Sequence, residues 1–457
     1  EKTNQNEASN MFELLLKNAD VVTECGMQKV DIGVNDGKIS ALLNPFAELS
    51  AKDIIDCTGK VILPGAIDTH AHLTYKEDFL HGTRSALRGG VTTVIEMPQS
   101  PLVGNFLRPE DAKCRFELIK KEAYADVALW AGMTRTTIDQ VEALDKIKPA
   151  GYKAFMNFAG DDYPYFDDYS MLQVMEKIKA TGRVLTVHAE NEAICAGLSE
   201  KFRIEGRGAD YHERSRPVIA ELEAINRLCL LAVETGCKVN VCHVSIPQGT
   251  ELVEAYRAMG ADITVETCPQ YLTLDESALI RCGSYAKCNP PLRAPELVDA
   301  LWEKVRDGCV HVVGSDHSCY PEAEKDQPIW NAPGGFPGLD LFLPGLINEG
   351  IHKRGISWEC LANLTATNAA KRMGLYPQKG AIRIGADADF AIVNPYEEWI
   401  FRGMNTFYKN PSSKYPYEGA HIKGKIAMTC LRGKVMYRDG EIIGEAGYGR
   451  FVPSISK

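Results

Sequence analysis

The middle of the chain, roughly residues 65 to 373, alternates short apolar, β-branched runs with longer segments that have helical spacing. Such alternation predicts a parallel sheet, because each helical segment returns the chain to the same edge of the sheet. The apolar runs end near eight positions, which are His70, Pro98, Met133, Phe158, His188, His243, Cys268 and Asp316. Eight strand–helix units favour an α/β fold of the (β/α)8 TIM barrel type over an open doubly wound sheet.

The connecting segments show apolar residues three and four positions apart, as in helices that cover a barrel. This spacing predicts helices over residues 80–87, 169–180 and 217–234. Gly182 and Gly236 follow the second and third of these segments and are expected to end them.

Both ends of the chain have a different character, with short β runs and turn signals such as Asn35-Asp36-Gly37 and Arg438-Asp439-Gly440. Because the termini of a domain often lie close together, residues 11–64 and 374–457 are predicted to form one small β-sandwich domain. Residues 65–373 are then the TIM-barrel catalytic domain, and the polar residues 1–10 a disordered tail.

Charge and hydropathy exclude several classes of partner. Lys+Arg 51 against Asp+Glu 61 gives a net charge of −10, and no basic run offsets it, so nucleic acid is not expected as a partner. No stretch of apolar residues is long enough for a membrane span, and the first ten residues are too polar for a signal peptide, which predicts a cytoplasmic protein. The 14 cysteines include no C-x-x-C pair and are interpreted as reduced core thiols.

The predicted strand ends are rich in metal-ligating residues, and barrel enzymes place their chemistry at these ends. The first strand ends in His70-Ala-His72, where two imidazoles two residues apart project to the same side of an extended chain. The fifth, sixth and eighth strands end in His188, His243 and Asp316. Each residue alone is more often structural, but five at the same end of a barrel indicate a metal site.

Lys153 lies inside the apolar fourth strand, where an ammonium ion would be expensive to bury. Alone it would be interpreted as a lysine whose amine reaches solvent. Among four histidines and an aspartate, its neutral amine is instead expected to add carbon dioxide, giving a carbamate whose two oxygens bridge two cations.

With these residues the chain resembles the amidohydrolase superfamily, in its cyclic amidase branch of allantoinases, dihydropyrimidinases or hydantoinases, and dihydroorotases. The resemblance covers nearly the whole chain, and further motifs that carry it are Gly89-Gly90-Val-Thr-Thr-Val, Ser215-Arg-Pro217, Cys268-Pro-Gln-Tyr271, Pro290-Pro-Leu-Arg293, Thr367-Asn-Ala-Ala370 and Gly385-Ala-Asp-Ala-Asp389. It implies one metal on His70, His72 and Asp316, a second on His188 and His243, and N6-carboxylated Lys153 between them.

Within this branch the segment Gly90-Val-Thr-Thr-Val-Ile-Glu-Met-Pro98 resembles the allantoinases most. Phe158 agrees with this, because hydantoinases have at this position a tyrosine that donates to the oxyanion. Gly334 stands where hydantoinases have an asparagine. The dihydroorotases fit worst, because no arginine follows His72. Hydantoinase or dihydropyrimidinase activity, or hydrolysis of another cyclic amide or imide, is the alternative, since the connection after His72 is short and Asn289 replaces a serine.

The resemblance implies hydrolysis of allantoin to allantoate, a step of purine catabolism, by a hydroxide that bridges two divalent metals, with Asp316 as general base and then acid. Zinc is expected first, with iron, cobalt or manganese as alternatives. Phe158, Asn289, Gly334 and Gly335 are expected to contact the small cyclic ureide or amide, with backbone amides near Asn289 and Gly335 as clamps on its ring. The resemblance also implies a homotetramer. A non-catalytic scaffold and a mononuclear deaminase are the remaining hypotheses, which metal analysis would separate.

Overall fold

The computed structural model describes residues 11–45 and 49–455, so the predicted tail at residues 1–10 lies outside the described part of the chain. At its centre is an eight-stranded parallel sheet whose strands follow one another in chain order. These strands are β8 (Ala66–Ala71), β9 (Val91–Glu96), β10 (Asp126–Gly132), β11 (Gly151–Phe155), β12 (Val184–His188), β13 (Val239–Val241), β14 (Ile263–Thr267) and β15 (Val312–Val313).

The last strand returns to the first, so the sheet closes into a barrel. Ala71 forms a parallel bridge with His317, the Asp316 N–H donates to the His70 carbonyl at 2.7 Å, and the His72 N–H donates to the His317 carbonyl at 2.8 Å. The predicted (β/α)8 barrel is therefore confirmed. The closure also brings the ends of β8 and β15 together, and both ends carry candidate metal ligands.

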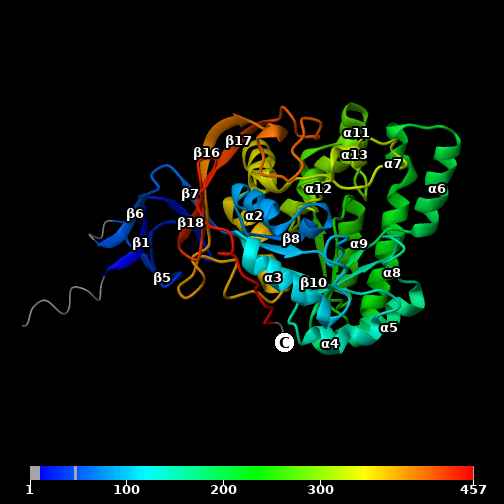
Figure 1. Ribbon diagram of the computed structural model, residues 1–457, viewed down its shortest axis with the longest axis horizontal. Helices are drawn as coiled ribbons and strands as arrows, with labels where there is room; N and C mark the ends of the chain where they lie inside the picture. The colour runs from blue at the N-terminus through cyan, green and yellow to red at the C-terminus, as the bar shows by residue number, and fades with distance from the viewer. Residues whose placement is uncertain (1–10, 46–48, 456–457) are drawn as a thin grey trace, which may run out of the picture.

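Helices follow the strands and cover the barrel from outside (Figure 1). Their bounds are α1 (Leu73–Lys76), α2 (Phe79–Arg88), α3 (Ala112–Glu122), α4 (Val141–Asp145), α5 (Asp168–Thr181), α6 (Glu192–Ile204), α7 (His212–Ser215), α8 (Val218–Thr235), α9 (Pro247–Ala258), α10 (Pro269–Thr273), α11 (Ser277–Cys282), α12 (Pro295–Arg306), α13 (Glu322–Lys325), α14 (Phe342–Leu346), α15 (Trp358–Ala362) and α16 (Asn368–Arg372).

The three helices predicted from apolar spacing are α2, α5 and α8, each within one residue of the expected bounds. Gly182 and Gly236 end α5 and α8 with φ of 73° and 68°, a left-handed conformation that glycine adopts without steric cost.

Two further sheets are built from both ends of the chain. The first contains β1 (Phe12–Lys17), β4 (Asp31–Asn35), β5 (Lys38–Leu43) and β6 (Ala51–Asp56). The second contains β2 (Asp20–Thr23), β3 (Gly26–Lys29), β7 (Val61–Pro64), β16 (Phe390–Ile400), β17 (His421–Leu431), β18 (Lys434–Arg438) and β19 (Glu441–Ile442).

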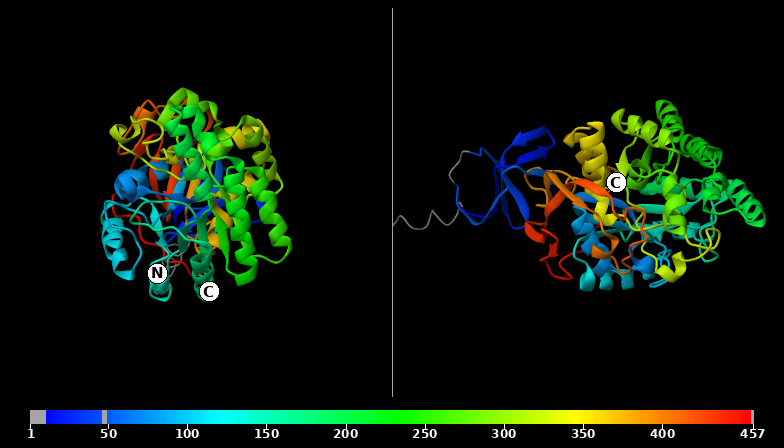
Figure 2. Two further views of the ribbon diagram at one scale, coloured as in Figure 1. Left: turned by 90° about the vertical axis from the view of Figure 1, so that its right-hand side faces the viewer. Right: turned by 90° about the horizontal axis from the view of Figure 1, so that it is seen from above.

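Side chains of the two sheets share one apolar core, with Leu16 and Ile32 from the first sheet and Ile62 and Ile392 from the second. Figure 1 places the four-stranded sheet at one end of the molecule, the seven-stranded sheet next to it and the barrel beyond, and Figure 2 shows the same order from above. The domain boundaries at residues 64/65 and 373/374 stay a prediction.

All 14 cysteines are free, and nine of them are buried, as expected for reduced core thiols. Among the described residues, no helix has the length and apolar character that crossing a membrane requires.

Candidate metal centre and active site

The ten side chains or glycines expected from the sequence to hold metals or substrate line one pocket of about 160 Å³ at the C-terminal mouth of the barrel. They are His70, His72, Lys153, Phe158, His188, His243, Asn289, Asp316, Gly334 and Gly335. A pocket of this volume is well below the roughly 300–1,000 Å³ of sites for drug-sized ligands, so it suits a small molecule.

His70, His72 and Asp316 form a compact triad at the seam between β8 and the end of β15. The Asp316 Oδ1 lies 3.3 Å from Nε2 of His70 and 3.3 Å from Nε2 of His72. The three ligand atoms lie within 4.8 Å of one another, which one cation can span. Burial alone would raise the pKa of Asp316, but its hydrogen bond with His72 helps to hold the pKa below its ordinary value, so the group is a carboxylate.

His188 and His243 complete the set of imidazoles from the ends of β12 and β13. Their ring centroids are 4.4 Å apart, and His243 lies 5.2 Å from His70. Burial holds the pKa values of all three histidines below the ordinary value, so each ring is neutral and has a free electron pair. Nδ1 of His243 is buried and has no hydrogen-bond partner, as expected of an atom that binds a ligand.

Two of these candidate ligands have unusual backbone conformations. His243 has φ of 36° and Asp316 has φ of 51°, in the left-handed region that side chains other than glycine adopt at a cost. Strain of this kind occurs at active sites, where the surrounding structure fixes it. Here it turns both side chains at the ends of short strands into the same pocket.

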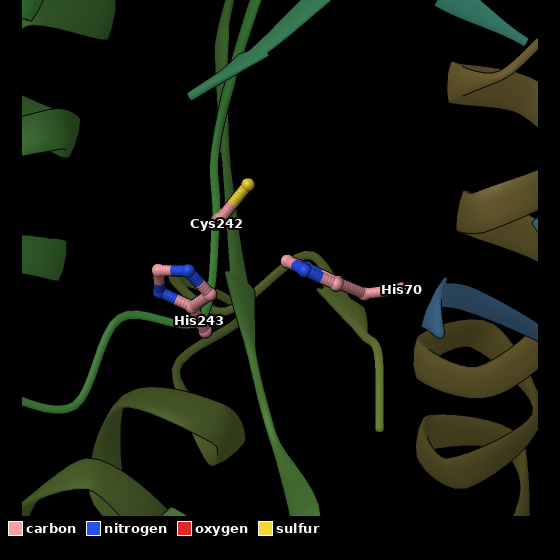
Figure 3. A group of neighbouring side chains, drawn as sticks. All are labelled: His70, Cys242 and His243. Carbon is pink, nitrogen blue, oxygen red and sulfur yellow. The ribbon is translucent and has the colours of Figure 1, made fainter. Parts of the chain in front are cut away.

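Lys153 lies on β11 with its side chain fully buried. Its Nζ lies 3.0 Å from Sγ of Cys242 and 4.6 Å from the ring centroid of Phe155, and it forms no ion pair with any described residue. Cys242 also groups with His70 and His243 as ligand atoms within reach of one cation, and Figure 3 shows His70 directed toward the strand end that carries both residues. Burial raises the pKa of Cys242 to about 11, so it is a thiol beside the lysine amine.

Two buried glutamates orient the imidazoles, and the sequence analysis missed both. Glu266 on β14 accepts a hydrogen bond from Nδ1 of His70 at 2.8 Å, which leaves Nε2 directed at Asp316. Glu190 lies 2.7 Å from Nε2 of His188 and is itself held by Arg216 at 2.6 and 2.9 Å. A carboxylate behind a ligating histidine fixes its tautomer and raises its basicity. An acid inside the apolar run Ile263–Thr267 was the available signal for Glu266.

The residues expected to contact the substrate lie around the mouth of the pocket, and their contacts with the substrate stay a prediction. The N–H of Gly335 donates to the Lys287 carbonyl at 2.8 Å, and its own carbonyl accepts from Lys325, so its backbone has no free donor for a substrate ring. A Cβ at position 334 would approach Nδ2 of Asn289 to 2.9 Å, so Gly334 leaves room for that amide. Phe158 is 57% exposed at the rim.

Further polar side chains line the pocket that the sequence analysis did not single out: Tyr75, Gln99, Asn157, Ser318 and Tyr320. Tyr75 packs edge-on against His72 and against Tyr320, at 6.1 and 5.8 Å between ring centroids. It belongs to the short connection after His72, so this connection supplies an aromatic wall. No pattern in the sequence distinguishes these residues from ordinary loop residues.

His317, the neighbour of Asp316, does not reach the pocket. Its Nε2 pairs with Glu77 at 2.9 Å, and its Nδ1 accepts from the N–H of Gly338 at 3.2 Å. Both ring nitrogens are occupied, so His317 has no role in proton transfer. Asp316 is the only carboxylate among the described residues that line the pocket.

Known proteins with similar sequences cover nearly the whole chain. Residues 61–436 match the model of the amidohydrolase family. An allantoinase of Rubrobacter xylanophilus is 39% identical over 453 residues, covering 96% of this chain and 97% of the relative. An allantoinase of Escherichia coli O1:K1 is 37% identical over 452 residues, covering 96% and 98%.

Among solved structures, the L-hydantoinase (dihydropyrimidinase) of Arthrobacter aurescens superposes with a TM-score of 0.93 at 31% identity, covering 97% of this chain and 100% of that one. The D-hydantoinase of Thermus sp. superposes with a TM-score of 0.89 at 27% identity, covering 97% and 99%. The likeness thus includes the barrel and the two sheets at its side.

Proposed function

The chain belongs to the amidohydrolase family and is a cyclic amide hydrolase, and from this premise we propose that it opens the ring of allantoin to give allantoate. The observation that carries the proposal is the likeness to allantoinases at 37–39% identity over nearly the full length of both chains. The small polar pocket and the absence of a hydroxyl at Phe158 agree with it. This reaction would belong to purine catabolism.

The residues in the pocket fit two divalent cations. His70, His72 and Asp316 would hold one, and His188 and His243 the other. The imidazoles of His70, His188 and His243 are neutral, and Nδ1 of His243 has no hydrogen-bond partner among the described residues. Zinc suits such histidine and carboxylate donors, as do iron, cobalt and manganese. When bound, the cations would lower the pKa of a shared water and polarise the scissile carbonyl.

We propose that Lys153 is carboxylated on Nζ and contributes to both cation sites. Its amine is fully buried without a counter-charge, a state that costs several kcal/mol for an ammonium ion. Addition of carbon dioxide to the neutral amine forms a C–N bond and releases one proton, leaving an anionic carbamate. This replaces an unpaired cation by two hard oxygen donors.

Asp316 acts as the proton carrier in this proposal. It accepts the proton that the attacking water loses and returns it to the departing ring nitrogen, so the ring opens without leaving a nitrogen anion. As the only carboxylate among the described lining residues, with His317 occupied elsewhere, it has no rival in the pocket.

A hydantoinase or dihydropyrimidinase is the second candidate, favoured by the TM-score of 0.93 against the L-hydantoinase. A substrate panel on metal-replete enzyme separates the two. We expect kcat/KM for allantoin to exceed the values for hydantoin and dihydrouracil by at least about 100-fold, the discrimination that a few hydrogen bonds to the ureido arm provide. Equal or better turnover of hydantoin would reject allantoin as the substrate.

The metal proposal has its own test in Lys153→Ala, with Lys177→Ala as the control because Lys177 is an exposed lysine on α5. We expect Lys153→Ala to fold and to lose at least one bound metal and nearly all activity. Short carboxylic acids or bicarbonate should restore part of the activity. Two bound metals and full turnover in this variant would contradict the bridging role.

We also propose a cytoplasmic homotetramer. Fourteen free cysteines favour a reducing compartment, whereas the tetramer rests on the family resemblance alone. Light scattering on the purified protein tests the assembly.

A further inference from the structure

A second cavity, of about 550 Å³, opens at the opposite mouth of the barrel from the active site. Lys238 and His311 on its wall directly precede β13 and β15, whereas His243 and Asp316 follow the same two strands. The remaining wall comes from β14, β15, α9, α16, the segment after α16 and Ile455. The volume lies in the range of roughly 300–1,000 Å³ that small-molecule sites occupy.

The wall of this cavity is strongly basic. Its basic residues are Lys238, Arg257, His311, Lys371 and Arg372, and no carboxylate belongs to the described lining. Among the described residues, two carboxylates reach these groups from outside the wall: Asp262 pairs with Arg372, and Glu254 with Arg257. Lys238 and Lys371 form no ion pair with any described residue, so the cavity has about two uncompensated positive charges, in a chain whose net charge is −10.

One buried N–H donor of this cavity also lacks an acceptor among the described residues. Nε of Arg372 is buried without a hydrogen-bond partner, although its other nitrogens are bound to Asp262 and to the Val239 carbonyl. Such a buried donor is uncommon in a folded protein and favours a ligand that completes it.

The hydrogen bond to Nδ1 of His311 leaves Nε2 as the nitrogen that carries the proton and can donate. Its Nδ1 accepts the Val265 N–H at 3.1 Å, so the proton of the neutral ring is on Nε2, which lies 3.6 Å from Glu254, beyond hydrogen-bond distance. Burial together with Arg257 and Arg372 lowers the pKa of His311 to about 4, which agrees with a positive potential in the cavity.

We propose that this cavity binds a small phosphate-bearing anion, with the phosphate held between Lys238, Lys371 and the N–H groups of His311 and Arg372. The donors reach the cavity from three places, the residues just before β13 and β15 and the helix α16. Such an arrangement suits a tetrahedral group, which accepts in all directions, better than a planar carboxylate. A phosphate fills only part of the volume, so there is room for an organic remainder beside the ring of Tyr376. The site is independent of the proposed substrate.

Calorimetric titration of metal-replete enzyme with inorganic phosphate, at constant ionic strength, tests the proposal. The test variant is Lys238→Met/Lys371→Met, because neither lysine has an ion pair to lose. The control is Lys113→Met, which removes an exposed lysine of α3 on another part of the barrel. We expect the double variant to bind phosphate at least about tenfold more weakly, because two charges at contact distance are lost, and the control to bind like the wild type.

Three results would overturn the proposal. If the double variant bound phosphate as tightly as the wild type, the phosphate would be bound at another site, such as the metals. No binding by the wild type up to about 10 mM phosphate would exclude a site of useful affinity. Malonate that binds as tightly as phosphate would exclude phosphate as the recognised group. The melting temperature of each variant, measured in parallel, shows whether it is folded.

Discussion

Glu266→Gln tests whether the metal centre depends on the carboxylate behind it. Glu266 accepts four hydrogen bonds: Oε1 from His70 Nδ1 at 2.8 Å and the His243 N–H at 3.3 Å, and Oε2 from the Thr69 hydroxyl at 2.8 Å and Asn240 Nδ2 at 3.3 Å. A glutamine has the same shape but only one acceptor oxygen. Whichever way its amide turns, two of the four donors meet an N–H group instead of an oxygen.

The magnitude follows from this count. A hydrogen bond to a charged group contributes about 1.5–3 kcal/mol, so two lost bonds cost up to about 3–6 kcal/mol in total. Part of this cost falls on folding. The rest weakens metal binding, because His70 is no longer held in a fixed orientation. We expect a 10–100-fold lower metal affinity, which corresponds to about 1.4–2.7 kcal/mol.

Competition with a chromophoric chelator measures the metal affinity, and urea unfolding of the metal-free protein measures stability. Asp126→Asn is the matched control, because Asp126 is an equally buried carboxylate of a barrel strand but pairs with Lys379 and Arg432 at the opposite end. We expect Asp126→Asn to lose stability and keep its metal affinity. If Glu266→Gln bound metal as tightly as the wild type, the orienting role of Glu266 would be refuted.

Three further outcomes are expected. Asp316→Asn should lower turnover by roughly 10²–10⁴-fold in steady-state assays of a metal-loaded sample, and a loss below tenfold would assign the proton transfer to another group. Phe158→Tyr should leave allantoin turnover unchanged, because its side chain is 57% exposed at the rim; a large gain on hydantoin alone would favour the hydantoinase alternative. Burial lowers the pKa of His212 to about 3, so as the pH falls the unfolded chain takes up a proton before the folded chain does. The free energy of unfolding therefore decreases below about pH 6.5, by roughly 1 kcal/mol at pH 5.5. His212→Gln should remove this loss in urea unfolding at pH 7.5 and 5.5, and an unchanged loss would contradict it.

The sequence predicted the barrel well because its strands are buried on both faces and therefore consist of continuous apolar runs. A residue that interrupts such a run stands out, which is why Lys153, His188 and His243 were found. The strands at the two ends of the chain were predicted only as short β runs, since sequences such as those of β2, β3 and β6 are short and partly charged, and β3 and β6 are mostly exposed. Their pairing depends on neighbours that are distant in the chain.

The substrate side of the pocket was harder to predict for a related reason. Asn289 and Gly334 come from loops that follow different strands, and only the folded chain shows that a side chain at position 334 would collide with the Asn289 amide. Backbone amides near Gly335 were expected to bind the substrate ring, and only the folded chain shows that the N–H of Gly335 itself donates to the Lys287 carbonyl and that its carbonyl accepts from Lys325. Sequence patterns report burial and spacing, whereas a free donor depends on every group that surrounds it.

Charge explains why the two clusters of acidic and basic residues in this barrel have different roles. Asp126, Asp387 and Asp389 lie close enough to hold a cation, but Lys379 stands among them with Nζ at 2.6, 2.9 and 2.7 Å. Burial alone would lower the pKa of Lys379, yet the three carboxylates raise it, so the ammonium ion is the cation of that site. At the active site the proportions are reversed, because neutral imidazoles and an unpaired lysine surround the single carboxylate of Asp316. Among the described residues, no lysine or arginine forms an ion pair with Asp316, so a metal ion bound there would meet its carboxylate and the free electron pairs of the imidazoles without competition from an ammonium or guanidinium ion.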